Sequence, residues 1–475
     1  MRSPPSDRGH EGRDLSTSVD SGEASCYKMP ALNVPASSLD SGDASARRLR
    51  RRQSLVLILL FSGYAAYYFC RANLSVATPL IADELHAGGM DRGSALLRIS
   101  EIASLGVLAY ALGKLLLTGI ADVWGGRRAF LLGLSGATLF TLMFAFGGVL
   151  PIFTIAWMGN RLTQSVGWAG LLKVCSKWFD FSSHGTIVGI LSLSYLVGDA
   201  IARQSMGVLI EHGSSWRGLF FYAAGITGLL WLLCFMLLRE SRADCGYPAA
   251  SENPLNVFAT SPSRAQRLPD LLKRLLTNAP FLLVCALSFG CTVVRETFNS
   301  WTPTYLNESS GYAVGRAASL SAIFPAVGAI SVLTMGWLSD RLGANGRAMI
   351  LVIGLTATTV ALAFLAALRP GAVHAGAALL LIGLTAFCLL GPYSYLGGAM
   401  ALDFGGKQAG ASASGIIDGI GYLGGTLAGV GVVQLSVIFG WRGVFVALAA
   451  VCAISAIAAG SLFVRQSRRI QARTP

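Results

Sequence analysis

The sequence predicts an all-α membrane protein of twelve transmembrane helices arranged as two six-helix repeats. Its composition, its apolar stretches and an internal repeat all point to this fold class. Of the 475 residues, 53% are hydrophobic and 13% are charged, whereas ordinary soluble domains carry about 25% charged residues. The mean hydropathy of +0.59 therefore argues against the soluble domains, about three in number, that this length would otherwise hold.

Twelve apolar stretches are long enough to cross a bilayer, whose hydrocarbon core of about 30 Å takes roughly 20 residues of helix. They lie near residues 54–82, 100–121, 128–148, 151–177, 184–208, 217–238, 280–305, 316–338, 347–368, 372–398, 409–436 and 441–464.

A polar stretch at residues 239–279 divides these spans into six and six. We expect six-helix halves over residues 53–238 and 280–464, joined by a cytoplasmic linker over 239–279. Residues 1–52 and 465–475 are expected to be cytoplasmic tails. The first tail is polar and rich in Ser, Asp and Gly, so we expect it to be disordered. It lacks the apolar core of a signal peptide and contains acidic residues, which a transit peptide would lack.

Positive charge follows the pattern of a membrane protein. A net charge of +13 can also indicate nucleic-acid binding, but here the arginines and lysines lie between the apolar stretches. Both tails, the linker and the turns around Arg127 and Arg341 are basic, and with twelve spans they all fall on one side. Because cytoplasmic loops carry the excess of Lys and Arg, we predict cytoplasmic termini, the lipid bilayer as partner and no nucleic acid. The sequence leaves open which membrane holds the protein.

The two halves repeat one another. Arg71 is followed by Thr78-Pro79, and Arg295 is followed at the same distances by Thr302-Pro303. The same offset, within a few residues, relates three further pairs of motifs: Gly119-Ile-Ala-Asp122 and Gly336-Trp-Leu-Ser-Asp340, Trp216-Arg217-Gly218 and Trp441-Arg442-Gly443, and Tyr195-Leu-Val-Gly198 and Tyr422-Leu-Gly-Gly425. Two six-helix repeats that share one orientation are the plan of the major facilitator superfamily, in which the site lies between the repeats near the midplane.

Arg71 and Arg295 occupy matching places inside the first and seventh spans. A charge at this depth costs roughly several kcal/mol, so it normally faces a cavity and has a partner. The planar guanidinium group matches phosphate and carboxylate oxygens, which predicts a two-arginine clamp for an anion. The alternative is that each arginine is satisfied by a nearby acid, for which Glu296 and Glu240 are available.

Three further charged residues lie within the predicted spans. Lys114 lies about 12 Å of helix before Asp122, and it either lines a cavity or extends its stem toward the headgroups. Asp199 either pairs with Arg203 one turn later or serves as a proton or counter-ion site. Asp418 has no partner close in sequence. Asp199 and Asp418 are therefore possible coupling residues.

The acidic residues of the two basic turns are interpreted differently. Asp122 with Arg127, and Asp340 with Arg341, are expected to act in gating or packing rather than as ligands. The sequence has no phosphate-binding glycine loop, dinucleotide-binding motif, metal-ligand spacing or catalytic triad pattern. We therefore expect no enzyme activity, no metal and no cofactor.

The segment Gly63-Tyr-Ala-Ala-Tyr67-Tyr68-Phe-Cys-Arg71-Ala-Asn73-Leu-Ser-Val-Ala-Thr-Pro79 resembles the first helix of the organophosphate:phosphate antiporter family, which includes bacterial glycerol-3-phosphate and hexose-6-phosphate transporters. The resemblance covers nearly all of residues 54–464. It extends to the following motifs: Gly167-Trp168, Lys173, Trp178-Phe179, Arg295 with Trp301-Thr-Pro-Thr-Tyr-Leu306, Gly336-Trp-Leu-Ser-Asp-Arg341, Gly391-Pro392 and Gly421-Tyr-Leu-Gly-Gly425.

This resemblance implies the exchange of an organic phosphate ester, such as glycerol-3-phosphate or a sugar phosphate, for inorganic phosphate by alternating access. It implies that Arg71 and Arg295 bind substrate and that Lys114 lines the cavity. The further substrate contacts that we expect are Tyr67, Tyr68, Trp168, Tyr195 and Tyr422. The sequence departs from the bacterial transporters by Ala72 in place of a lysine, Tyr195 in place of a histidine and Asp199 in place of a glycine.

Two other functions stay open. A proton-coupled symporter for an organic anion would use Asp199 or Asp418, and a transporter-like sensor would bind a phosphate ester and signal. We expect a monomer. Asn307-Glu-Ser309 is a glycosylation sequon on the side predicted to be non-cytoplasmic, and it matters only if the membrane belongs to the secretory pathway.

Overall fold

The computed structural model describes residues 36–117, 124–180, 184–250, 275–342 and 346–471. Residues 1–49 form one unit and residues 50–475 another, and the architecture below is that of the second. Helix α1 begins at Ala36, so the disorder expected for residues 1–52 is wrong for 36–52. Alanine, leucine and arginine are good helix formers, and they carry this helix N-terminal to the first apolar stretch. Residues 1–35 lie outside the described residues.

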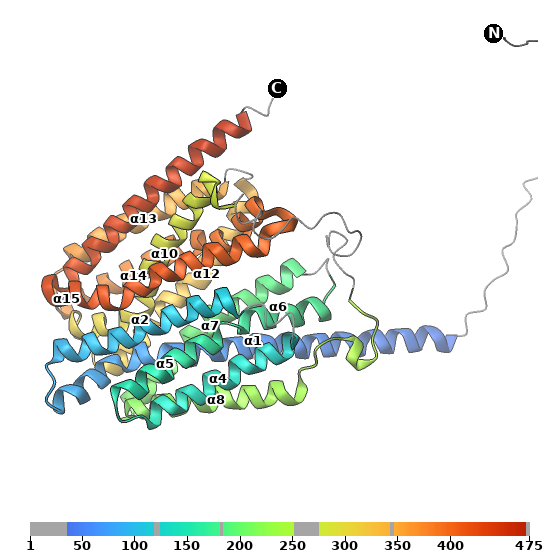
Figure 1. Ribbon diagram of the computed structural model, residues 1–475, viewed down its shortest axis with the longest axis horizontal. Helices are drawn as coiled ribbons and strands as arrows, with labels where there is room; N and C mark the ends of the chain where they lie inside the picture. The colour runs from blue at the N-terminus through green and yellow to red at the C-terminus, as the bar shows by residue number, and fades with distance from the viewer. Residues whose placement is uncertain (1–35, 118–123, 181–183, 251–274, 343–345, 472–475) are drawn as a thin grey trace, which may run out of the picture. The chain divides into compact units, whose positions relative to one another are not determined.

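Two series of helices make up the described chain, one from each half of the sequence (Figure 1). The helices of the first half are α1 (Ala36–Ala87), α2 (Arg92–Leu116), α4 (Gly126–Phe146), α5 (Leu150–Gln164), α6 (Gly167–Trp178), α7 (His184–Glu211) and α8 (Trp216–Leu237). Those of the second half are α10 (Ala279–Glu308), α11 (Val314–Ser321), α12 (Ile323–Leu342), α13 (Gly346–Ala367), α14 (Ala375–Tyr393) and α15 (Ala401–Gln471). Short turns of helix at Ala243–Cys245, Ala372–His374 and Leu396–Met400 connect some of them.

Among the described residues, ten helices are long and apolar enough to cross a membrane. The fourth predicted span is divided between α5 and α6, each too short to cross alone. The last two predicted spans both lie in α15, where Gly440 has a φ of 66°, a left-handed conformation that glycine adopts readily. The described helices are therefore consistent with the twelve predicted spans.

Polar side chains begin several helices in the way that their sequences predict. The side chain of Asp91 accepts a hydrogen bond from the amide of Ser94 at the start of α2. Ser215 caps α8 and Asn278 caps α10 by the same contact. Each cap supplies an acceptor for an amide group that has no partner within its helix.

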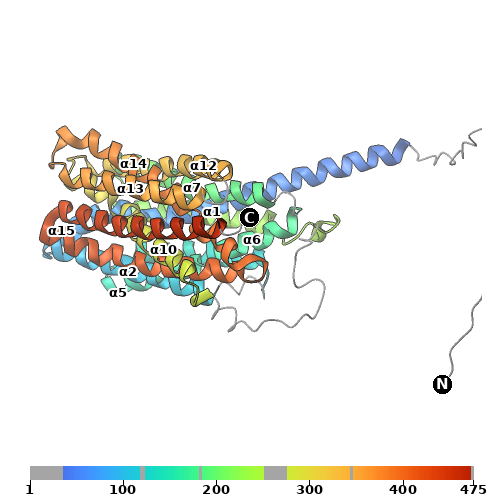
Figure 2. The ribbon, with the colours of Figure 1, turned by 90° about the horizontal axis from the view of Figure 1, so that it is seen from above.

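The two halves meet where α2 packs against α15 and where α7 packs against α11 and α12; Figure 2 also shows α7 beside α12. The hydroxyl of Ser104 in α2 donates to the carbonyl of Thr426 in α15 at 2.9 Å. Gly207 in α7 lies so close to α11 that a Cβ there would overlap Ser319. Small residues allow this close approach of membrane helices.

Contacts between the halves continue at the end of the bundle where α1 ends and α2 begins, which we call the closed end. Trp216 donates to Glu84 at 2.5 Å, and its repeat partner Trp441 donates to Glu308 at 3.1 Å. Arg92 forms ion pairs with Asp83 and, across the halves, with Glu308 at 3.6 Å. The repeat seen in the sequence therefore corresponds to equivalent contacts in the two halves.

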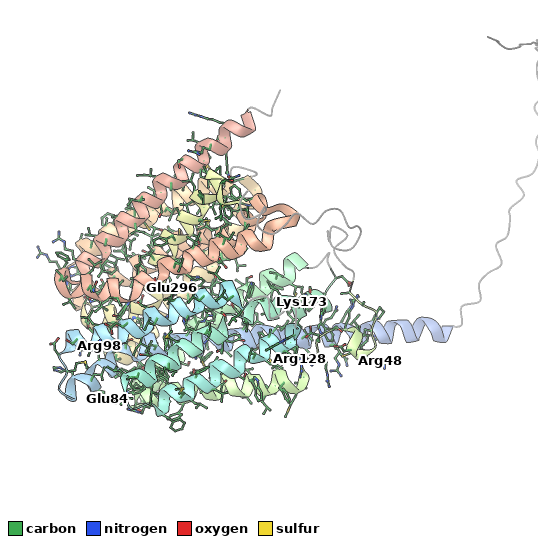
Figure 3. All side chains as sticks on the ribbon, in the orientation of Figure 1. Arg48, Glu84, Arg98, Arg128, Lys173 and Glu296 are labelled. Atoms are coloured by element: carbon green, nitrogen blue, oxygen red, sulfur yellow. The ribbon has the colours of Figure 1, made fainter. Side chains whose placement is uncertain are left out.

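The opposite end, which we call the basic end, carries the turns around Arg127 and Arg341. Figure 3 shows Arg128 and Lys173 toward this end, Glu84 and Arg98 toward the closed end, and Glu296 inside the bundle. Figure 1 shows the helices of the two halves diverging toward the basic end.

Glu240 organises the start of α4 at the basic end. Its carboxylate accepts hydrogen bonds from the amides of Gly126 and Arg127 at 2.9 and 2.7 Å and from Lys177 at 2.7 Å. Burial opposes ionisation, but these donors hold the pKa of Glu240 below its usual value. Glu240 thus stabilises α4 rather than pairing with Arg295.

The turn residues expected to act in gating are placed only in part. The side chain of Arg127 donates to the carbonyls of Leu238 and Phe235 at 2.6 and 2.5 Å, which fastens α4 to the end of α8. The guanidinium carbon of Arg341 lies 3.9 Å from the ring centroid of Trp337. Asp122 and the side chain of Asp340 lie outside the described residues.

Candidate anion-binding site between the two halves

Arg71 is held inside the bundle by residues of three helices. Its Nε donates to Oε1 of Gln164 at 2.5 Å, and its Nη1 donates to the hydroxyl of Tyr68 at 3.1 Å. The guanidinium carbon lies 4.8 Å from the ring centroid of Tyr68 and 4.5 Å from that of Tyr110. Cation–π contacts of this length stabilise a desolvated guanidinium group, so Arg71 is preorganised without a carboxylate among these contacts.

Arg295 lies at the equivalent place in α10 and has a carboxylate partner. Its Nη2 donates to Oε1 of Glu296 at 2.7 Å. Its guanidinium carbon lies 4.8 Å from the ring centroid of Tyr393 and 5.2 Å from that of Tyr422. The alternative in which an arginine is satisfied by a nearby acid therefore describes part of the surroundings of Arg295, and the acid is Glu296.

A third arginine, Arg161 of α5, completes the site, and the sequence analysis missed it. Its Nη2 lies 3.8 Å from Oε2 of Glu296, and its guanidinium carbon is 5.6 Å from the ring centroid of Tyr110 and 5.8 Å from that of Trp157. Arg161 has no arginine at the equivalent place of the second repeat, where the offset leads to Thr385. Its place inside an apolar span was the available signal, because arginines at that depth are rarely without a function.

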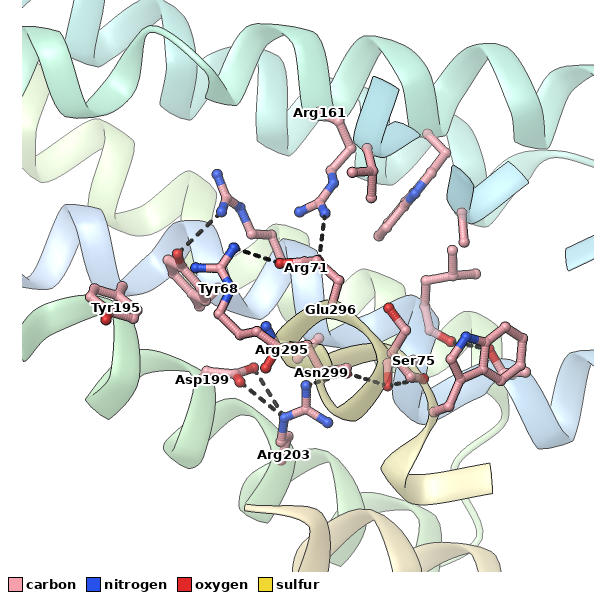
Figure 4. A pocket seen from close by; sticks show the side chains of 18 of the residues that line it. Tyr68, Arg71, Ser75, Arg161, Tyr195, Asp199, Arg203, Arg295, Glu296 and Asn299 are labelled. Atoms are coloured by element: carbon pink, nitrogen blue, oxygen red, sulfur yellow. Dashed lines mark hydrogen bonds and ion pairs between the residues drawn. The ribbon is translucent and has the colours of Figure 1, made fainter. Parts of the chain in front are cut away.

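The three arginines surround a small pocket of about 70 Å³. Figure 4 shows the side chains of Arg71, Arg161 and Arg295 converging beside Glu296. Within the described part of the chain, Nε of Arg161, Nε of Arg295 and Nε1 of Trp157 are buried without a hydrogen-bond partner, and all three residues line this pocket. Since an unpaired buried donor costs about 1–3 kcal/mol, the pocket is suited to a ligand that accepts hydrogen bonds.

A larger cavity of about 600 Å³ adjoins the small pocket on the side of the basic end. Tyr68, Tyr195 and Arg295 line both spaces. The aromatic side chains lining the larger cavity are Tyr64, Tyr68, Tyr110, Trp168, Tyr195, Tyr393 and Tyr422. The site therefore combines a narrow cationic pocket with a wide aromatic cavity.

Of the aromatic residues expected at the site, four line the larger cavity and one does not. Tyr68, Trp168, Tyr195 and Tyr422 lie in its wall. Tyr67 is buried elsewhere, where its hydroxyl donates to the carbonyl of Phe130 at 2.9 Å. Neighbouring helical residues point about 100° apart, so Tyr67 and Tyr68 cannot both face the cavity, and the expectation for Tyr67 is wrong.

Lys114 lines the larger cavity rather than pointing out to the headgroups. Its Nζ lies 3.5 Å from Oδ2 of Asp418 in α15 and 5.7 Å from the ring centroid of Tyr110. Asp418, which has no partner close in sequence, thus has one across the two halves. The lysine and the aspartate come from opposite sides of the cavity.

Asp199 pairs with Arg203 one turn later in α7. Both carboxylate oxygens lie 3.1 Å from Nε of Arg203. The same arginine donates from Nη2 to the carbonyl of Asn299 at 2.6 Å and from Nη1 to the hydroxyl of Ser321 at 3.3 Å. Asp199 therefore belongs to a buried network that joins α7 to the second half.

A search of protein families matches residues 60–429 to the Major Facilitator Superfamily. The chain is 27% identical to the "Probable hexose phosphate transport protein" of Chlamydia pneumoniae over 83% of this chain and 88% of that protein. It is 25% identical to the "Glycerol-3-phosphate transporter" of Bacillus subtilis over 87% and 92%. It is also 26% identical to the "Membrane sensor protein UhpC" of Salmonella typhimurium over 87% and 92%.

Solved structures show the same fold at low sequence identity. The crystal structure of a bacterial homologue of the human lysosomal transporter Spinster superposes with a TM-score of 0.67, at 15% identity, over 87% of this chain and 98% of the other. That of the nucleoside transporter NupG superposes with a TM-score of 0.64, at 16% identity, over 87% and 99%. The relatives confirm the resemblance to the organophosphate:phosphate antiporter family, and the chain belongs to the Major Facilitator Superfamily.

Proposed function

We propose that the protein exchanges an organic phosphate ester for inorganic phosphate by alternating access. The observation that carries this proposal is that Arg71 of the first half and Arg295 of the second half line one pocket. A phosphate group seated there would bridge the two halves. Guanidinium groups bind phosphate oxygens through paired, charge-assisted hydrogen bonds.

The charges of the site suit a phosphate group. Three guanidinium groups, those of Arg71, Arg161 and Arg295, line the small pocket with the single carboxylate of Glu296 close to them. The other acids near the site have their own cations, since Asp199 pairs with Arg203 and Asp418 pairs with Lys114. A phosphate ester with a second pKa of about 6 carries one to two negative charges at neutral pH and offsets the surplus.

This surplus supplies a reason for exchange. When the pocket is empty, Arg71 and Arg295 repel one another and oppose the approach of the two halves around them. A bound phosphate reverses the sign of this interaction, so that the loaded protein changes conformation more readily than the empty one. A ligand can shift such a balance only by its differential affinity for the two states, and a bridging anion has that property.

The larger cavity is where we place the organic part of the ester. Its volume of about 600 Å³ lies within the range of small-molecule sites, and its aromatic walls can pack against the carbon skeleton of a glycerol or sugar unit. The named hexose phosphate and glycerol-3-phosphate transporters among the relatives support a substrate of this class.

Two other functions are weighed against this proposal. A proton-coupled symporter would use Asp199 or Asp418, and each is already paired with a cation. A phosphate-ester sensor is favoured by the similarity to a protein named as a membrane sensor. We also propose that both termini face the cytoplasm, because the basic segments lie on that side, and that the protein works as a monomer.

Counterflow tests the proposal. Purified protein in proteoliposomes loaded with inorganic phosphate is expected to take up labelled glycerol-3-phosphate or sugar phosphates, and Arg71→Lys is expected to reduce uptake at least tenfold because lysine keeps the charge but loses the guanidinium fork. Arg98→Lys, on the exposed part of α2, is the matched control. Uptake that needs a pH gradient but no internal phosphate would favour the symporter, and binding without any transport would favour the sensor.

A further inference from the structure

Glu296 lies among the arginines of the proposed phosphate pocket. Its Oε1 accepts a hydrogen bond from Arg295 at 2.7 Å, and its Oε2 lies 3.8 Å from Nη2 of Arg161, beyond hydrogen-bond distance. The residue is 6% exposed, and its Cγ packs where a Cβ at Gly425 would touch it. A carboxylate has about four lone-pair sites, so it retains the capacity to accept further hydrogen bonds.

The pocket therefore offers donors on several sides and an acceptor on one. Its unpartnered donors are Nε of Arg161, Nε of Arg295 and Nε1 of Trp157. A phosphoryl group that carries one proton has the complementary pattern, because its bare oxygens accept hydrogen bonds and its single O–H donates one. An oxyanion without a proton would instead place a lone pair against the carboxylate of Glu296.

The groups around Glu296 leave the carboxylate as the acceptor that a ligand would meet. The cations are Arg295 on its own helix, Arg161 on α5 and Arg71 on α1, and the phenol groups are those of Tyr110 on α2 and Tyr422 on α15. From α7, the carboxylate of Asp199 and the guanidinium group of Arg203 line the same pocket, and they are paired with each other.

We propose that Glu296 makes this pocket select phosphoryl groups that carry a proton, an inference that rests on the proposed function. Inorganic phosphate keeps a proton in both its monoanion and its dianion, so it binds throughout the neutral range. A phosphate ester keeps one only as the monoanion, below its second pKa of about 6. Sulfate has a similar size and charge but no proton at neutral pH, so the pocket rejects it.

The surplus of positive charge cannot make this distinction. It attracts phosphate, sulfate and esters alike, and it favours a dianion over a monoanion. The local contact with Glu296 opposes that preference, because one hydrogen bond to a charged group is exchanged for one repulsive contact. The expected discrimination between phosphate and sulfate is at least about tenfold.

Direct binding to the purified protein tests the proposal. Titration calorimetry at pH 7.5 is expected to show inorganic phosphate binding at least tenfold tighter than sulfate. Glu296→Gln, whose amide group can donate to a bare oxygen, is expected to bring the two affinities within threefold. The exposed Glu101→Gln of α2 is the control and is expected to keep the wild-type ratio. Wild-type protein that binds sulfate as tightly as phosphate would overturn the proposal.

Transport supplies the second readout. In wild-type proteoliposomes the KM for glycerol-3-phosphate is expected to rise about tenfold between pH 5.5 and 7.5, while the KM for inorganic phosphate changes less than threefold. Glu296→Gln is expected to flatten the ester profile. A steep ester profile that persists in Glu296→Gln, with phosphate binding retained, would refute the role of Glu296.

A folding defect in Glu296→Gln is separated from loss of selectivity by Glu296→Asp, which keeps the charge and the acceptor and is expected to keep sulfate rejection. Sulfate binding by folded Glu296→Asp as tight as phosphate binding would contradict the proposal. Phosphate binding without any exchange would overturn the proposed function but leave the sulfate comparison intact as a test of Glu296. Absence of phosphate binding by the purified wild-type protein would overturn both.

Discussion

The hydroxyl of Ser75 in α1 donates to the carbonyl of Asn299 in α10 at 2.9 Å, and these two residues occupy equivalent positions in the two repeats. Pro303, four residues after Asn299, has no amide hydrogen and so leaves that carbonyl without its helical donor. Arg203 supplies a second donor at 2.6 Å. A defect that proline creates in one half is thus satisfied by side chains of the other, on the closed-end side of the arginines.

Ser75→Ala is expected to lower the free energy of unfolding by about 1 kcal/mol, because one donor to Asn299 is lost while Arg203 remains. Pro303→Ala restores an amide hydrogen for the same carbonyl, so Ser75→Ala is expected to cost less in that background. Thermal unfolding in detergent, analysed as a double-mutant cycle, measures the difference. Ser205→Ala is the control within α7, and strict additivity of the two substitutions would contradict this account.

Lys114→Ala is expected to raise the KM for phosphate about tenfold. The substitution removes a positive charge from the cavity wall and leaves Asp418 facing the ligand, and a unit charge about 10 Å away contributes about 1–2 kcal/mol in a partly screened site. Lys114→Ala combined with Asp418→Asn is expected to recover part of the loss. Initial rates of phosphate exchange provide the measurement, and unchanged kinetics would show that Lys114 is only an anchor.

Asp199→Asn is expected to destabilise the protein by about 3–5 kcal/mol, because it leaves Arg203, which is 2% exposed, without its counter-charge. Asp199→Asn with Arg203→Gln is expected to restore much of that stability. Unfolding midpoints test both statements. The pH profile of exchange by the surviving Asp199→Asn molecules should match that of wild type. A profile that loses its pH dependence, with exchange retained, would instead identify Asp199 as a proton-coupling site.

Glu240→Gln is expected to lower the free energy of unfolding by about 2 kcal/mol at pH 7. The pKa of Glu240 is lower in the folded protein than in the unfolded chain, so its contribution is full above the unfolded value of about 4.3. It is lost as the pH falls through the folded value. The difference from wild type should therefore shrink as the pH is lowered toward 4. Glu101→Gln is the control, and a difference that is constant across this range would contradict the assignment.

The sequence by itself determined the membrane class, the two repeats and the matching depth of Arg71 and Arg295. Each of these depends on composition or on spacing along the chain, which hydropathy and the repeat offset report directly. It also showed that Asp199 and Arg203 could pair, because a separation of four residues places two side chains on one face of a helix.

Only the tertiary structure decided which charges meet across helices. Arg161 and Glu296 are far apart in the sequence, and Lys114 and Asp418 belong to different halves, so no local spacing relates either pair. Tyr67 and Tyr68 differ by one position, yet one packs within the first half and the other faces the cavity. The rotation of each helix about its axis decides such outcomes, and that rotation is determined by packing between helices, which periodicity along one chain segment does not report.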